Sequence, residues 1–112
     1  MPIKDDWIEF KKENIRALPL NLIGVYECGY KRGNIVVYIG KGIIRDRLLD
    51  HKEKASFLGI THFRKRKTSS ISAAEDAEAR LIEQFRKLHN GNPPKLNTNI
   101  PKLKKSDDWF SW

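Results

Sequence analysis

Hydrophobic residues along the chain follow two spacings, and each spacing predicts a type of element. Residues 22–31 (LIGVYECGYK) are rich in aromatic and β-branched side chains, and residues 35–39 (IVVYI) form a continuous apolar run. Both segments are therefore predicted strands. Arg32-Gly33-Asn34 between them is a typical turn sequence. We expect the two strands to form a hairpin.

Helical spacing predicts three helices. Residues 5–17 carry apolar side chains at this spacing, start at an aspartate cap and end before Pro19. Trp7 in this segment is interpreted as an anchor against the sheet rather than a nucleic-acid stacking residue. Residues 44–55 form the second helix. The third begins at the capping box Ser72-Ala73-Ala74-Glu75 and runs to about His89.

The order of elements predicts an α+β fold. Residues 58–67 read as a third strand, so a three-stranded antiparallel sheet flanked by helices is expected. Residues 1–112 are predicted to form a single domain with its core at 22–97, an extra N-terminal helix at 5–17 and a basic, aromatic tail at 98–112. The role of Trp109-Phe110-Ser111-Trp112 in this tail, folding back on the core or docking a partner, stays open.

Charge narrows the class of partner. The chain has 22 Lys+Arg against 14 Asp+Glu, a net charge of +8, which favours a polyanion and above all nucleic acid. Its single cysteine, Cys28, excludes an internal disulfide and a cysteine-based zinc site and fits a reducing cytoplasm. No apolar run reaches the roughly 18 residues of a membrane span, and no signal-peptide hydrophobic region is seen. We expect a cytoplasmic protein that does not associate with membranes.

Two tyrosine motifs carry the strongest functional signal. Gly24-Val25-Tyr26, then Tyr38-Ile39-Gly40, then Arg47 and His51 four residues apart, then an acidic helix residue and an asparagine, resemble the GIY-YIG nuclease superfamily. Arg47 and His51 would share one helix face. The segments 78–83 (EARLIE) and 94–97 (PKLN) are similar to the N-terminal nuclease domain of the bacterial excision-repair incision subunit. The resemblance covers roughly residues 22–97 and implies a GIY-YIG-like sandwich.

The resemblance implies an endonuclease that hydrolyses phosphodiester bonds in DNA with one Mg²⁺ or Mn²⁺ ion. Tyr26 and His51 would activate or orient water, and Arg47 would stabilise the phosphoryl transition state. Glu83 would hold the metal, with Glu78 as the alternative ligand. Arg45 is the alternative to Arg47. The implied catalytic set is Tyr26, Tyr38, Arg47, His51 and Glu83, supported by Gly24, Gly40, Lys41 and Asn97.

Basic side chains outside the motifs provide the expected surface for phosphate contacts. They are Arg45, Arg64, Lys65, Arg66, Lys67, Lys104 and Lys105. Charge does not distinguish DNA from RNA, so RNA stays open as a partner, as does the choice between repair, restriction and recombination. The oligomeric state is also open. The alternative function is a non-catalytic nucleic-acid-binding module of the same fold.

Overall fold

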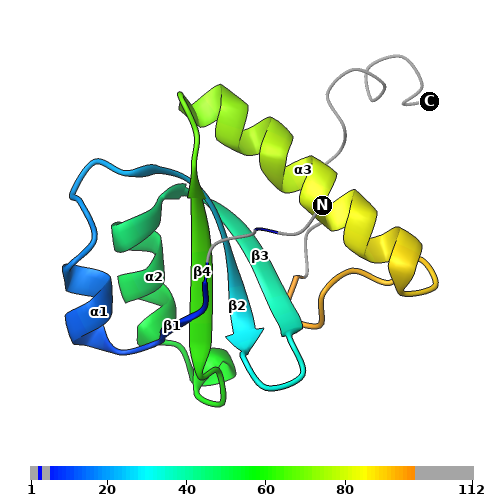
Figure 1. Ribbon diagram of the computed structural model, residues 1–112, viewed down its shortest axis with the longest axis horizontal. Coiled ribbons are helices and arrows are strands. Elements are labelled where there is room, and N and C mark those ends of the chain that lie inside the picture. The colour runs from blue at the N-terminus through cyan, green and yellow to red at the C-terminus, as the bar shows by residue number, and fades with distance from the viewer. Residues whose placement is uncertain (1–2, 4–5, 98–112) are drawn as a thin grey trace.

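The strands of the protein form one antiparallel sheet (Figure 1). The computed structural model describes residue 3 and residues 6–97. In this part of the chain the sheet has four strands in the order β1-β4-β2-β3. Their bounds are β1 (Ile8–Glu9), β2 (Ile23–Tyr30), β3 (Ile35–Ile43) and β4 (His62–Lys67). The α+β class is thus confirmed, while the prediction of three strands missed the short edge strand β1.

The N-terminal segment is a short strand followed by a short helix, so the helix predicted over 5–17 is wrong. Ile8 pairs with Phe63 and Glu9 with His62 at the edge of β4. Helix α1 spans only Lys12–Arg16. Pairing at the open edge of a strand outweighs a weak local helical preference. Phe10 is nevertheless buried. The apolar side chain predicted to face the core was therefore identified correctly, although the segment around it is not a single helix.

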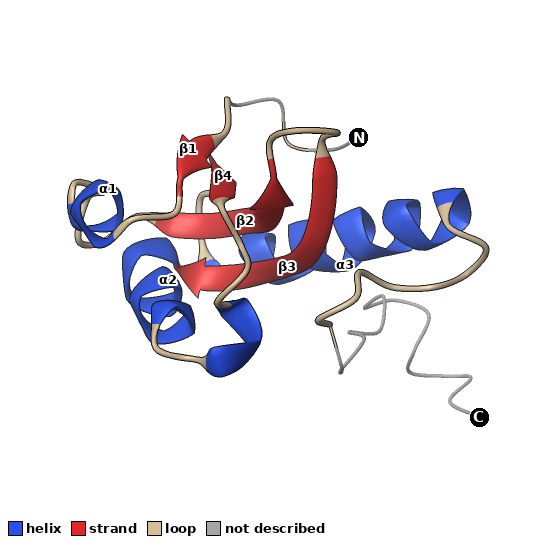
Figure 2. Cartoon of the chain, turned by 90° about the horizontal axis from the view of Figure 1, so that it is seen from below, coloured by secondary structure: helices blue, strands red, loops and turns tan. Residues whose placement is uncertain are grey.

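Helices cover both faces of the sheet (Figure 2). Helices α1 and α2 (Ile44–Lys52) lie on one face and α3 (Ile71–Leu88) lies on the other. Because side chains alternate along a strand, Tyr26 of β2 packs with Leu48 of α2, whereas its neighbour Val25 packs with Leu81 of α3. Among the described residues, none of the helices is long and apolar enough to cross a membrane.

The predicted helix boundaries need small corrections. Helix α2 ends at Lys52 rather than at 55, and a 3-10 turn, η1 (Ala55–Phe57), separates it from β4. The cap of α3 is Ser70, whose hydroxyl accepts a hydrogen bond from the Ala73 amide at 3.0 Å, rather than the predicted Ser72. The predicted end near His89 is confirmed by its C-cap. The tail predicted at 98–112 lies outside the described residues.

The glycine-rich stretch after Tyr38 stays in the sheet. The second strand of the hairpin was predicted to end at residue 39, yet β3 continues to Ile43, with Gly40 opposite Tyr26 and Gly42 opposite Gly24. The Ile44 amide then donates to the Leu22 carbonyl at 2.9 Å. Helix α2 therefore starts directly where β3 ends. Its first turn lies at the end of the sheet where the two tyrosine motifs pair.

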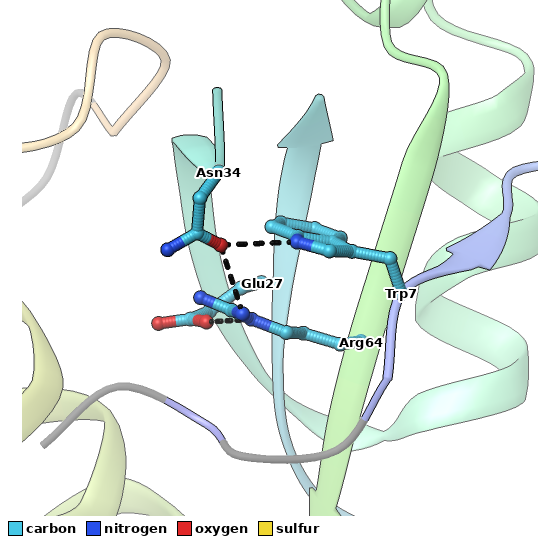
Figure 3. A network of polar contacts seen from close by, with 4 residues as sticks. All are labelled: Trp7, Glu27, Asn34 and Arg64. Atoms are coloured by element: carbon cyan, nitrogen blue, oxygen red, sulfur yellow. Dashed lines mark hydrogen bonds and ion pairs between the residues drawn. The ribbon is translucent and has the colours of Figure 1, made fainter. Parts of the chain in front are cut away.

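A polar network around a buried ion pair joins β2 and β4 to the hairpin turn and to Trp7, the residue before β1 (Figure 3). Arg64 of β4 donates from Nε to Glu27 Oε1 of β2 at 2.6 Å and from a terminal nitrogen to Asn34 Oδ1 at 3.1 Å. The Trp7 indole donates to the same Asn34 oxygen at 3.0 Å, and its ring lies 4.3 Å from the Arg64 guanidinium carbon. Burial raises the pKa of Glu27, and the Arg64 charge opposes that shift.

This network corrects one expected role and confirms another. Arg64 was expected to contact nucleic acid, but its guanidinium is committed to a buried ion pair with Glu27. Trp7, interpreted as an anchor against the sheet, does pack on β4 through Arg64. Arg64 forms this ion pair because it points into the protein beside the buried Glu27 carboxylate. Leaving either buried charge without a partner would be costly in free energy.

We predict that Arg64→Ala lowers the free energy of unfolding by roughly 3–5 kcal/mol, because it leaves the Glu27 carboxylate buried without its partner. Urea denaturation at pH 7.5 measures the change. The matched control is Arg66→Ala, two residues along the same strand and exposed, for which a change within about 0.5 kcal/mol is expected. Equal losses in both variants would contradict the assignment of Arg64 to the buried network.

Candidate active site

Tyr26 occupies a space that a glycine makes available. Its side chain is fully buried on the α2 face of the sheet, and Gly40 lies opposite it on β3. A Cβ atom at Gly40 would lie 2.4 Å from both Cζ and Oη of Tyr26. Any side chain at this position would displace the phenol. Gly40 therefore allows the close approach of the Tyr26 ring to β3.

His51 meets Tyr26 from helix α2. Its Nε2 lies 2.7 Å from the Tyr26 hydroxyl oxygen. Burial lowers the pKa of His51 to about 4, the nearby Arg47 and Lys54 charges act in the same direction, and Asp50 opposes them. The imidazole is therefore neutral at physiological pH. For His51 to accept a proton at Nε2, its ring hydrogen must sit on Nδ1, and Tyr26 then donates the hydrogen bond.

Tyr26 is a neutral phenol in the free protein. Burial raises its pKa above the ordinary value, and the adjacent Tyr38 and Cys28 add to this, while Arg47 opposes it. Desolvation outweighs the charge of Arg47, so the nearby positive charge does not make Tyr26 a phenolate in the free protein. Tyr26 is instead a neutral phenol whose hydroxyl is hydrogen-bonded to His51.

Tyr38 stands between the buried pair and the surface. Its ring lies edge-on to His51, with centroids 4.9 Å apart, and 6.2 Å from the ring of Tyr26. Burial raises the pKa of Tyr38, Arg47 opposes the shift, and the Glu78 carboxylate adds to it. Tyr38 is only partly buried, in contrast to Tyr26.

Arg47, not Arg45, faces the tyrosines. Its electrostatic interaction with Tyr26 raises the pKa of Arg47, hydrogen bonding to the Tyr26 and Tyr38 phenols acts in the same direction, and burial acts against the shift. Gly42, at φ +125°, lies under the Arg47 stem, where a Cβ would be 3.3 Å from its Cγ. Arg45 instead lies 4.0 Å from Asp46. Of the two arginines that the sequence left open, Arg47 is the one that lies beside the tyrosines.

The acidic residue that the structure brings to this cluster is Glu78, and not Glu83. Glu78 lies 4.0 Å from the Lys41 ammonium with a side chain only 12% exposed. Burial raises its pKa, while Lys41 and Arg47 lower it. Glu83 is 40% exposed and pairs with Arg86 at 3.7 Å. Five residues at about 100° each turn it roughly 140° around the helix from Glu78, which explains the different surroundings.

Glu78, the alternative metal ligand in the sequence, is thus the glutamate that lies near Lys41 and Arg47. Both glutamates lie in the segment 78–83, and the motif alone did not separate them. Their positions around the helix axis separate them, because of the two only Glu78 lies on the face of α3 that meets Lys41. We call Tyr26, Tyr38, Arg47, His51 and Glu78 the tyrosine cluster. Lys41 joins its edge through Glu78.

Two supporting residues act on the backbone. Asn97 donates to the Ile39 carbonyl and accepts from the Ile39 amide, both at 2.9 Å, so it braces β3 next to Tyr38. This is the bracing role expected for it. Gly24 permits close approach of β4, because a Cβ there would lie 2.1 Å from the Arg66 carbonyl oxygen. Its contribution is therefore to strand packing.

The basic residues expected to bind nucleic acid separate into distinct settings. Arg66 and Lys67 are exposed at the end of β4, and Lys67 pairs with Gly24, which in turn pairs with Gly42. They therefore lie at the same end of the sheet as Arg47. Lys65 is partly buried and has an interaction of its own. Lys104 and Lys105 lie outside the described residues.

A preformed multi-ligand metal centre is absent from the described part of the chain. It holds no group of three or more His, Cys, Asp and Glu side chains that could bind an ion together. Mg²⁺ commonly keeps several waters and binds through one or two carboxylates together with substrate phosphate. The single carboxylate of Glu78, beside Lys41 and Arg47, has the chemistry of a Mg²⁺ site that is completed by substrate phosphate and water.

The model of a family described as a domain of unknown function (DUF7508) matches residues 1–87. The match includes every residue of the tyrosine cluster, and Asn97 lies beyond it. A search of the curated proteins found no match to the chain.

We predict that stability falls as the pH is lowered through the range set by His51. Its pKa is about 4 when folded and about 6.5 when unfolded, so below pH 6.5 the unfolded chain binds more protons and is favoured. Lowering the pH from 7.5 to 4.5 should cost roughly 2–3 kcal/mol through this group.

Urea denaturation across this pH range, comparing the protein with His51→Gln, isolates the effect, since the raised carboxyl pKa values of Glu27 and Glu78 act on both proteins alike. His62→Gln, a histidine on β4 that contacts Thr61, serves as the control. Parallel curves for the protein and His51→Gln would show that His51 is not buried in its neutral form.

Proposed function

The chain belongs to the DUF7508 family, and from its site we propose that it is a metal-dependent endonuclease of the GIY-YIG type that hydrolyses phosphodiester bonds in DNA. The observation that carries the proposal is the tyrosine cluster. Two phenols, a neutral imidazole, a guanidinium and a carboxylate, drawn from four elements of the fold, meet at one end of the sheet.

The pairing of the two tyrosine motifs supports the family resemblance. Gly24-Val25-Tyr26 and Tyr38-Ile39-Gly40 lie on adjacent antiparallel strands, with Tyr26 directly opposite Gly40. Helix α2 then delivers Arg47 and His51 to the same place, four residues apart. A set of residues scattered over the sequence from 26 to 78 thus becomes one compact group, as a catalytic assignment requires.

Arg47 is the phosphate-binding residue of the proposed reaction. Its guanidinium is the fixed cation beside Tyr26 and Tyr38, and its planar set of donors matches two phosphate oxygens. Negative charge grows on those oxygens as water attacks phosphorus in line with the leaving oxygen. Arg47 therefore stabilises the transition state more than the bound substrate, which is the condition for faster chemistry.

Tyr26 and His51 handle the proton of the attacking water. As the water oxygen bonds to phosphorus, its proton passes to Tyr26 Oη while the Tyr26 hydroxyl proton moves to His51 Nε2, 2.7 Å away. The P–O bond to the leaving oxygen breaks, and that oxygen takes a proton from solvent. His51 is a weak base in the free protein, and the negative charge of a bound phosphate favours its protonated form.

Glu78 would hold the divalent cation, which supplies further positive charge at the phosphate when bound. The fit rests on its surroundings: the carboxylate is mostly buried, lies 4.0 Å from the Lys41 ammonium, and has its pKa lowered by Lys41 and Arg47 against the effect of burial. In the free protein, Lys41 balances the carboxylate. The donor is oxygen, as Mg²⁺ and Mn²⁺ prefer.

Nucleic acid is the partner that the charge supports. The net charge is +8, and the exposed Arg66 and Lys67 lie at the site end of the sheet. Contacts between such side chains and phosphates are insensitive to base sequence and weaken with salt. They support DNA binding without indicating a target sequence, and RNA is compared directly as a substrate in the first test.

We predict that Glu78→Gln abolishes Mg²⁺- or Mn²⁺-dependent cleavage of DNA, because the amide keeps the shape of the side chain but removes the charge that holds the metal. Nicking and linearisation of a supercoiled plasmid, and cleavage of branched DNA and of RNA, measure the activity with metal and with chelator. Glu83→Gln is the matched control on the same helix and should retain cleavage within about twofold.

The outcomes separate the candidate functions. Cleavage lost in Glu83→Gln and kept in Glu78→Gln would return the metal to Glu83 and refute the assignment made from the structure. No cleavage of any substrate by the unaltered protein, with salt-sensitive DNA binding retained, would identify a non-catalytic nucleic-acid-binding module.

We predict that Arg47→Ala lowers kcat for cleavage by roughly 10²–10³, the usual cost of removing one transition-state donor. Arg45→Ala, two residues earlier on the same helix, is the matched control and should alter kcat far less. Single-turnover cleavage at saturating protein measures the chemical step. Equal losses in the two variants would mean that Arg47 contributes general charge and not a placed donor.

A further inference from the structure

The His51 ring lacks the hydrogen bond that commonly fixes a functional histidine. Nε2 contacts Tyr26, but Nδ1 is buried and has no hydrogen-bond partner among the described residues. In most sites, a carbonyl or carboxylate bound to one ring nitrogen sets the orientation of the other. In this protein, packing must orient the His51 ring, because Nδ1 makes no hydrogen bond with the described residues.

Phe57 makes the closest ring contact with His51. The two rings stack with centroids 4.3 Å apart and planes inclined by 9°. The same phenylalanine meets Tyr38 edge-on at 5.2 Å and 70°. Phe57 is buried and belongs to η1, where its amide donates to the Lys54 carbonyl at 3.0 Å and its carbonyl accepts from Ile60 at 3.1 Å. Its ring therefore has a fixed backbone behind it.

We propose that Phe57 is a positioning residue of the active site. Its ring holds the plane of His51 so that Nε2 meets the Tyr26 hydroxyl, and its face keeps water away from the imidazole. The same Phe57 ring also positions the Tyr38 phenol through their edge-on contact. The effect of Phe57 on cleavage rests on the proposed nuclease function, whereas its effect on the geometry of His51 does not.

The proton affinity of His51 reports this packing. The titratable and charged groups that face the imidazole are Tyr26 from β2, Tyr38 from β3, and Arg47, Asp50 and Lys54 from α2 and the turn after it. Removing the stacked ring changes none of these charges. It exposes the imidazole to water, which favours the protonated form and moves the His51 titration upward toward the ordinary value near 6.5.

The deciding experiment is an NMR pH titration of the His51 ring in the full chain. In Phe57→Leu we expect the His51 midpoint to rise by roughly one pH unit. Phe63→Leu is the matched control: it removes a ring from the same buried core cluster, so it destabilises the protein but leaves the midpoint of His51 in place. Phe57→Tyr, which retains the ring, should restore the original midpoint.

Cleavage kinetics supply the second measurement. Phe57→Leu should lower kcat roughly tenfold to a hundredfold with little change in KM, because misplacement of a catalytic group affects the chemical step. An unchanged His51 midpoint in Phe57→Leu, or an equal rise in Phe63→Leu, would overturn the role of Phe57. If the unaltered protein cleaves nothing, the nuclease proposal fails, while the titration still decides whether Phe57 positions His51.

Discussion

The packing of the Tyr26 ring over Gly40 is the contact on which the site depends. It fixes the register of β2 against β3, because only a glycine leaves room for the phenol. With that register set, Tyr38 lies beside Tyr26, and helix α2 starts where β3 ends. Arg47 and His51 lie on α2 and are thereby held beside the two tyrosines. The site is thus built on strands and a helix rather than on loops, which favours precise placement.

Burial and charge act on the tyrosine cluster in opposite and complementary ways. Burial raises the pKa of both phenols and lowers the pKa of His51. Arg47 opposes burial at the tyrosines and reinforces it at the histidine. The free protein therefore presents two neutral phenols and a neutral imidazole beside the Arg47 charge, with the Lys41–Glu78 pair nearby. Such a site favours an anion, whose arrival makes protonation of His51 easier.

The arginines and Lys67 of β4 lie in two different settings. Arg64 lies in the sheet's buried network with Glu27, Asn34 and Trp7, whereas Arg66 and Lys67 are exposed near the cluster. The alternation of side chains along a strand accounts for only part of this difference, since Arg64 and Arg66 share the same parity. What separates them is the burial of the strand's centre and the exposure of its end.

Local chemistry in the sequence determined much of this protein: the α+β class, the hairpin of β2 and β3, the end of α3 and the candidates Tyr26, Tyr38, Arg47 and His51. Short-range spacing suffices there because neighbouring residues on a strand or helix have fixed relative directions. Tertiary structure alone decided the rest. Strand β1 formed because β4 had an open edge, Glu78 rather than Glu83 met the cluster through the phase of α3, and Arg64 was claimed by Glu27. Phe57 carried no signal in the sequence, because its contacts with His51 and Tyr38 exist only once η1 has folded onto the sheet.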